Sequence, residues 1–281
     1  MQDDVERESA ASWVVSLRSI GTQRPLFCAC AGRGDVFEYR AFASSLPKDL
    51  PIYAFGIPPL LTGNPIPTVE ELAAVYLQKV RELQSHGPYR LCGHSFGGLV
   101  VFQMALLLER EGEEVDLLAL LDTLNPAHKH ALTDRERAEF RRTYLFSRFG
   151  RYARNLATGR LDKVLSEVCF FLGTFIKRTF WKTVRSTFTK LGHPIPEAIR
   201  SDAMILTAAW HAYVPADRYN GKIVLVASAD RPPEHEVDPS LGWRPYAADL
   251  EICVVPGNHY SMLQPPRVEV LVERLMAYLT H

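Results

Sequence analysis

Apolar runs of strand length alternate with helix-patterned segments along this chain of 281 residues, and this alternation constrains its fold more than any other feature. Alternation of this kind is typical of a mostly parallel sheet with helices on both faces. We expect strands at residues 13–17, 25–30, 52–56, 89–92, 116–121, 222–227 and 250–255. We expect helices at residues 39–45, 69–85, 98–111 and 266–279. The sequence therefore predicts the α/β class.

The alternation is interrupted once, by a long segment that has a basic and aromatic helical pattern and no strand pattern. A helical insertion that follows a strand end is expected to form a lid over the carboxyl edge of the sheet, where such folds bind ligands. Residues 125–200 are therefore predicted to be a helical lid. Residues 1–124 and 201–281 are predicted to be the two parts of one α/β core.

The net charge gives no reason to expect a nucleic-acid partner, because 32 Lys and Arg balance 32 Asp and Glu. The charges are nevertheless unevenly distributed. Residues 126–194 carry fifteen Lys or Arg against five Asp or Glu. This basic segment is either a solvated helical surface or a docking surface for an acidic partner.

Cysteine usage and the N-terminal residues predict a cytoplasmic protein with free thiols. The five cysteines are odd in number and lie mostly in strand-like runs, and residues 1–10 are acidic rather than signal-like. The longest apolar stretch, residues 168–176, is too short to span a bilayer. Cys28 and Cys30 are interpreted as strand residues that face one side of the sheet, and no metal site is expected.

A glycine-rich motif, GHSFGG at Gly93–Gly98, lies where a predicted strand is followed by a predicted helix. A serine in this context is typical of a nucleophile elbow, in which a sharp turn exposes the hydroxyl above the sheet. Ser95 is therefore the candidate nucleophile. The backbone N–H of Phe96, at the start of the helix, is a candidate oxyanion donor.

A serine nucleophile needs a base and an orienting carboxylate. Of the nine histidines, only His259 directly follows the last predicted strand and precedes the last helix, so it is the candidate base. His94, inside the elbow, is expected to pack or hydrogen-bond nearby. Asp122 and Asp230 each end a strand and fit the chain order Ser, Asp, His, so spacing leaves both open as the acid.

Four segments resemble the thioesterase domains that end nonribosomal peptide and polyketide synthases. They are LFCACAGRG at residues 26–34, the elbow GHSFGG, LLDT at residues 120–123, and GNHYSML at residues 257–263. The resemblance implies an α/β-hydrolase fold. It also implies that Asp122 is the acid, as in chain-terminating members, whereas discrete proofreading members would use Asp230. The second oxyanion donor implied by the resemblance is the N–H of Gly32.

The resemblance implies release of an acyl, polyketide or peptidyl chain from the phosphopantetheine thioester of a carrier protein. The reaction would pass through an acyl-enzyme on Ser95 and end in hydrolysis or cyclisation, and the domain would need no cofactor of its own. The alternatives are a discrete proofreading thioesterase, a cytosolic carboxylesterase and an inactive carrier-binding module. The basic segment would suit an acidic carrier protein; membrane attachment through residues 175–182 is a further alternative.

Overall fold

The computed structural model describes residues 13–32, 34–58, 67–127, 202–231 and 238–279, together with scattered positions between 135 and 187. The chain divides into two compact units, of which the first comprises residues 1–131, 202–231 and 238–281. The second comprises residues 132–201 and 232–237. The predicted lid, residues 125–200, lies mostly outside the described residues, so its boundaries and its role stay a prediction.

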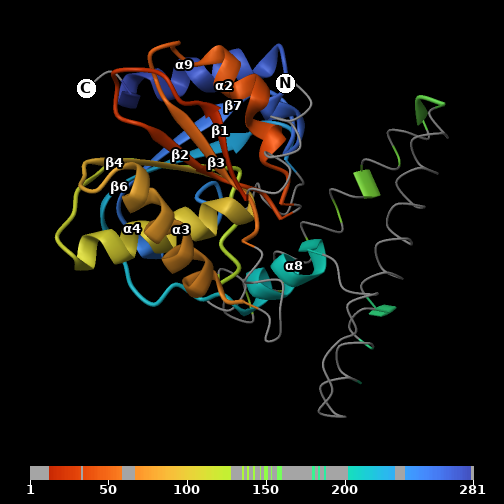
Figure 1. Ribbon diagram of the computed structural model, residues 1–281. Coiled ribbons are helices and arrows are strands. Elements are labelled where there is room, and N and C mark those ends of the chain that lie inside the picture. Colours follow the sequence, from red (N-terminus) through yellow and green to blue (C-terminus); the bar gives the residue numbers. More distant parts are fainter. Residues whose placement is uncertain are drawn as a thin grey trace. The chain divides into compact units, whose positions relative to one another are not determined.

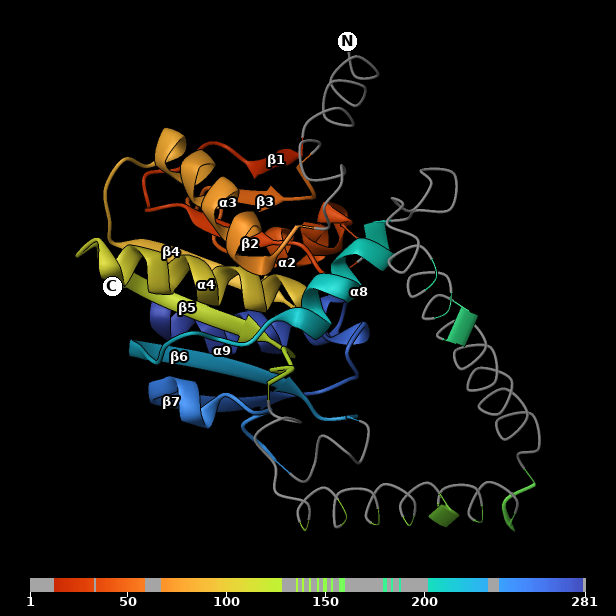
Figure 2. The same cartoon turned by 90° about the horizontal axis from the view of Figure 1, so that it is seen from below.

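The first unit is built on a seven-stranded sheet with the strand order β1-β3-β2-β4-β5-β6-β7 (Figures 1 and 2). The strands are β1 (Val14–Arg18), β2 (Leu26–Ala29), β3 (Ile52–Phe55), β4 (Tyr89–His94), β5 (Val115–Leu121), β6 (Tyr219–Ser228) and β7 (Ala247–Val255). Strand β1 pairs antiparallel with β3, and all other neighbours are parallel. The predicted strands and the predicted α/β class are confirmed.

Helices cover both faces of this sheet. Helices α3 (Val69–Leu83) and α4 (Phe96–Arg110) lie on one face, and α2 (Arg40–Ser45) and α9 (Arg267–Leu279) lie on the other (Figures 1 and 2). Short 3-10 helices η1 (Val36–Tyr39), η5 (Arg244–Tyr246) and η6 (Ser261–Leu263) occupy connections. Among the helices that the structure describes, none has both the length and the apolar character needed to cross a membrane.

Helix α8 (Asp202–Ala212) was not predicted. Its sequence, DAMILTAAWHA, is apolar over most of its length. It therefore lacks the alternation between an apolar and a polar face that reveals a surface helix in a sequence. Leu206 and Ala209 of this helix are buried with the side chains of α3 and α4.

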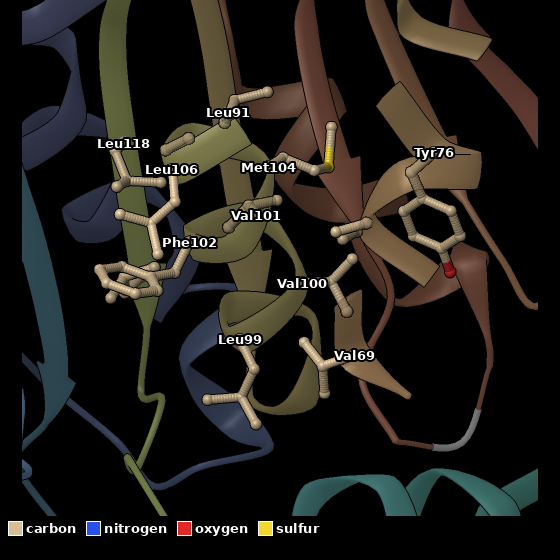
Figure 3. Close-up of a cluster of buried hydrophobic side chains, with 14 of the residues drawn as sticks. Val69, Tyr76, Leu91, Leu99, Val100, Val101, Phe102, Met104, Leu106 and Leu118 are labelled. Atoms are coloured by element: carbon tan, nitrogen blue, oxygen red, sulfur yellow. The ribbon is translucent and has the colours of Figure 1, made fainter. Parts of the chain in front are cut away.

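The core consists of two clusters, one on each face of the sheet, because successive strand side chains point to opposite faces. Phe27 and Ala29 belong to the cluster beneath α3 and α4, whereas Leu26 and Cys28 belong to the cluster beneath α2 and α9. Figure 3 shows the first cluster, in which apolar side chains of α4 pack among those of α3, β4 and β5. Cys30 directly follows β2 rather than belonging to it, but it lies in the same cluster as Cys28, so the two residues face one side of the sheet as predicted.

The segment that leaves β5, residues 123–127, is fixed by the loop before β7. The Trp243 indole N–H donates to the Thr123 carbonyl at 2.7 Å. The backbone N–H of Asn125 donates to the Leu241 carbonyl at 2.9 Å. Thr123, Asn125 and Trp243 are fully buried. This β5 exit segment is therefore held in place immediately after the carboxyl end of its strand.

Candidate active site

Ser95 occupies the sharp turn between β4 and α4. Its backbone has φ 55° and ψ −116°, a conformation that non-glycine residues rarely adopt. The turn requires small neighbours. A Cβ at Gly97 would lie 2.1 Å from the Ala29 carbonyl oxygen, and a Cβ at Gly93 would lie 2.3 Å from the Gly97 carbonyl oxygen. The glycines of the motif thus allow the close approach of α4 to β2 and β4.

His259 lies in the loop after β7, within hydrogen-bond distance of Ser95. Its Nε2 is 3.0 Å from the Ser95 Oγ. The loop is shaped locally, because the Asn258 side-chain oxygen accepts the backbone N–H groups of Tyr260 and Ser261 at 3.1 and 3.0 Å. The His259 side chain is 31% exposed.

Asp122 directly follows β5, and its Oδ2 is 2.8 Å from the His259 Nδ1. Ser228, the last residue of β6, donates its backbone N–H and its hydroxyl to the same carboxylate at 2.9 and 3.0 Å. Burial raises the pKa of Asp122, but the hydrogen bonds from His259 and Ser228 outweigh burial and leave this pKa below its usual value. An ionised Asp122 accepts a hydrogen bond from the His259 Nδ1–H. Nε2 then carries no proton and can accept a hydrogen bond from the Ser95 hydroxyl.

Asp230, the alternative acid, is exposed. It lies two residues beyond the end of β6, where its backbone N–H donates to the Gly257 carbonyl at 2.8 Å. The geometry thus brings Asp122 to His259 and leaves Asp230 at the surface. Ser228 was missed by sequence reasoning, although a polar residue at the end of a buried parallel strand is a signal that could have found it.

Gly32, the second candidate oxyanion donor, lies beside the elbow. A Cβ at Gly32 would be 3.7 Å from the Cβ of Phe96. The preceding N–H, that of Ala31, already donates to the Glu38 Oε1 at 2.8 Å. Phe96 is the first residue of α4, and the first N–H groups of a helix have no acceptor within it. The N–H groups of Phe96 and Gly32 therefore remain the candidate donors to an oxyanion.

His94, the residue before Ser95, is buried and does not contact the serine as a base. Its Nδ1 lies 3.2 Å from the Glu38 Oε2, and its Nε2 lies 2.9 Å from the His259 carbonyl oxygen. The expectation that His94 hydrogen-bonds nearby is thus met. Glu38, in η1, was missed, because no motif marks it in the sequence. Within the described part of the chain, no cluster of His, Cys, Asp and Glu side chains could hold a metal ion.

The comparisons with known proteins agree on one family. The family model for the thioesterase domain matches residues 24–279. Malpinin synthetase of Mortierella alpina is 28% identical over 97% of this chain, which covers 3% of the synthetase. Chondramide synthase cmdD of Chondromyces crocatus is 30% identical over 95% of this chain, which covers 7% of that synthase. The chain thus spans less than a tenth of these relatives.

Solved structures with a similar fold include a thioesterase domain and a nonribosomal peptide synthetase. The NocB thioesterase domain, in covalent complex with a fluorophosphonate nocardicin G analog, aligns with a TM-score of 0.61 and 23% identity. That alignment covers 95% of this chain and 100% of the NocB domain. A four-domain nonribosomal peptide synthetase bound to AMP and glycine aligns with a TM-score of 0.65 and 20% identity, over 98% of this chain and 21% of the synthetase. At these identities the structural matches establish the α/β-hydrolase fold.

Proposed function

Because the chain belongs to the thioesterase domain family, which implies a hydrolase, we propose that it releases a finished chain from a synthetase. The substrate is an acyl, polyketide or peptidyl group held as a thioester on the phosphopantetheine arm of a carrier protein. The observation that carries this proposal is the continuous hydrogen-bonded series Ser95, His259 and Asp122 at the carboxyl edge of the sheet. The large synthetases among the relatives support the choice of substrate class.

In the first half of the reaction, the Ser95 Oγ attacks the thioester carbonyl carbon while His259 Nε2 takes the hydroxyl proton. The Asp122 carboxylate stabilises the resulting imidazolium through Nδ1. The tetrahedral oxyanion is stabilised by the N–H groups of Phe96 and Gly32, and loss of one such donor typically costs about 3–4 kcal/mol. The carbon–sulfur bond then breaks, and the departing thiolate takes the proton from His259 and leaves as the thiol.

In the second half, a nucleophile attacks the acyl group on Ser95. His259 removes a proton from that nucleophile, and the Ser95 oxygen leaves with the proton as the tetrahedral intermediate collapses. Water gives a free acid, whereas an amine or hydroxyl within the bound chain gives a ring. The same residues serve both outcomes, so the nucleophile that reaches the acyl-enzyme determines the product.

The carrier protein is the proposed partner, and the basic segment at residues 126–194 is the proposed region that attracts it. Carrier proteins are usually acidic, and the phosphopantetheine arm bears a phosphate. Opposite charges on two partners raise the rate at which they associate. The domain itself requires no cofactor in this scheme, because the phosphopantetheine arrives with the substrate.

The test is mass spectrometry of the intact protein after incubation with acyl-carrier thioesters. We expect an added mass equal to the acyl group, located on Ser95. Ser95→Ala should form no adduct and should lose several powers of ten in turnover, because only substrate binding and the oxyanion donors remain. Ser44→Ala is the matched control, because Ser44 is an exposed serine of α2 and should not affect the adduct.

Two results would overturn the proposal. If folded Ser95→Ala keeps more than a few per cent of the activity, Ser95 is not the nucleophile. If the wild-type protein forms no adduct and does not react with a fluorophosphonate, the domain is an inactive carrier-binding module. Faster hydrolysis of a long-chain oxygen ester than of the matching thioester would instead identify a carboxylesterase.

A further inference from the structure

A second histidine–carboxylate pair, Glu38 and His94, lies next to the candidate active site, where His94 contacts His259. The His94 Nδ1 is 3.2 Å from the Glu38 Oε2, and the two side chains are 3% and 19% exposed. The other nitrogen of His94, Nε2, is 2.9 Å from the backbone carbonyl oxygen of His259. The other oxygen of Glu38, Oε1, accepts the backbone N–H of Ala31 at 2.8 Å. The pair therefore contacts the loops on both sides of Ser95.

The contact with His259 fixes the orientation of the His94 ring. A carbonyl oxygen can only accept a hydrogen bond, so His94 Nε2 donates its N–H to the His259 carbonyl oxygen. This orientation turns the other ring nitrogen, Nδ1, toward the Glu38 Oε2.

The position of His94 is itself fixed by buried contacts. Its backbone N–H donates to the Tyr39 hydroxyl oxygen at 2.8 Å, and that hydroxyl donates to the Ala29 carbonyl at 2.7 Å. The ring of His94 packs against the ring of His259, with centroids 4.7 Å apart. His94 therefore contacts both the backbone carbonyl and the ring of His259.

We propose that Glu38 and His94 are positioning residues. They fix the candidate base, His259, relative to the loop of Ala31 and Gly32, which carries a candidate oxyanion donor. This inference rests on the proposed function for the roles of His259 and Gly32. Glu38 accepts a hydrogen bond from the backbone N–H of Ala31, the residue before Gly32. His94 donates a hydrogen bond to the backbone carbonyl of His259. Displacement of a reacting group by about 1 Å can cost on the order of a hundredfold in rate. The pair thus acts on catalysis without touching the substrate.

The first test compares His94→Leu with His94→Gln. Leucine is of similar size but cannot donate to the His259 carbonyl, whereas the glutamine amide can. We expect His94→Leu to lower kcat by about 10- to 100-fold with little change in KM, and His94→Gln to recover most of that loss. The rate at which a fluorophosphonate labels Ser95 should change in parallel. The proton NMR signal of the His259 Nδ1–H should shift in His94→Leu and return toward its wild-type position in His94→Gln.

The second test uses Glu38, which is less buried and so less critical for folding. The amide of Glu38→Gln can still accept from Ala31 and donate to His94 Nδ1, so labelling should slow by no more than about threefold. Glu38→Leu can do neither, and labelling should slow by about tenfold or more. The matched control is His86→Leu. His86 forms the same kind of pair with Glu113, at 3.3 Å, but its side chain is 83% exposed and it precedes β4, at the opposite end of that strand from Ser95.

The proposal is overturned if folded His94→Leu labels at the wild-type rate, or if His94→Gln is no better than His94→Leu. If His94→Leu does not fold, equal labelling rates for Glu38→Leu and Glu38→Gln overturn it. A change of similar size in His86→Leu would also do so. Labelling separates this proposal from the proposed function, because a wild-type protein that labels but releases no carrier thioester refutes only the proposed function.

Discussion

Two of the three candidate catalytic side chains belong to residues in a backbone conformation that usually requires glycine. Ser95 has φ 55° and Asp122 has φ 45°. Such conformations cost on the order of 1–3 kcal/mol each and persist where the surroundings fix them. Each is fixed by the next strand of the sheet. The Ser95 N–H donates to the Leu121 carbonyl at 2.9 Å, and the Asp122 N–H donates to the Val226 carbonyl at 2.7 Å.

The two candidate acids give opposite predictions. Asp122→Asn should keep the fold and lose about four orders of magnitude in kcat, because an amide can hold the wrong imidazole tautomer and cannot stabilise the imidazolium. Asp230→Asn is the matched control and should be nearly silent, because Asp230 is exposed at the surface. Steady-state turnover of one acyl-carrier thioester measures both.

Thermal unfolding of both variants must be compared with that of the wild type, because Asp122 also accepts two hydrogen bonds from Ser228. An Asp122→Asn protein with a matching melting temperature and near-normal turnover would remove Asp122 from the mechanism. A large loss in Asp230→Asn alone would identify the discrete proofreading type.

The residues of this site differ in how far the sequence reveals them. Ser95 and His259 are marked by a motif and by their places at strand ends, and they come within 3.0 Å of each other. Spacing could not choose between Asp122 and Asp230, because the choice depends on which strand end reaches the imidazole. The role of Glu38 could not be foreseen, because its contact with His94 spans 56 residues and depends on the turn of η1.

At the scale of elements, the closeness of α4 to β2 depends on Gly97. An added Cβ would lie 2.1 Å from the Ala29 carbonyl oxygen and 2.7 Å from that of Cys30. We expect Gly97→Ala to lower the free energy of unfolding by about 1–3 kcal/mol or more, because backbone atoms must move to admit the methyl group. Urea unfolding measures this change.

Gly150→Ala is the matched control for Gly97→Ala. Gly150 is also helical, but a Cβ there would have no neighbour within 4 Å among the residues that the structure describes. The free energy of unfolding of Gly150→Ala should therefore be unchanged or slightly increased. Equal unfolding midpoints for wild type and Gly97→Ala would mean that the elbow tolerates a wider separation of α4 and β2 than its geometry indicates.

Elements with a clear local signal were predicted well. The start of α3 follows from Thr68 and Glu71, which cap the helix reciprocally through hydrogen bonds of 3.1 and 2.8 Å. Strands β2 and β5 were recognisable as short apolar runs bounded by turn residues. Helix α8 gave no such signal, because its sequence is apolar over most of its length and has no amphipathic pattern.

For the molecule as a whole, net neutrality conceals a separation of charge, since residues 126–194 carry a large excess of Lys and Arg. If this basic segment attracts an acidic carrier, KM for the carrier-bound thioester should rise steadily with ionic strength, because salt screens the attraction. KM for a small soluble thioester should hardly change. Kinetics of both substrates at low and high salt decide the matter, and equal salt slopes would show that the segment is only a solvated surface.

The buried hydrogen bonds of the β5 exit segment bear on which residues of the domain can be exchanged without moving the candidate acid. Trp243 and Leu241 hold the chain at Thr123 and Asn125, directly after Asp122. We therefore expect changes in length or sequence beyond Ala127 to have little effect on the position of the Asp122 carboxylate. If the residues that follow form the predicted lid, we expect that they can be exchanged for another sequence while Asp122 keeps its hydrogen bond to His259.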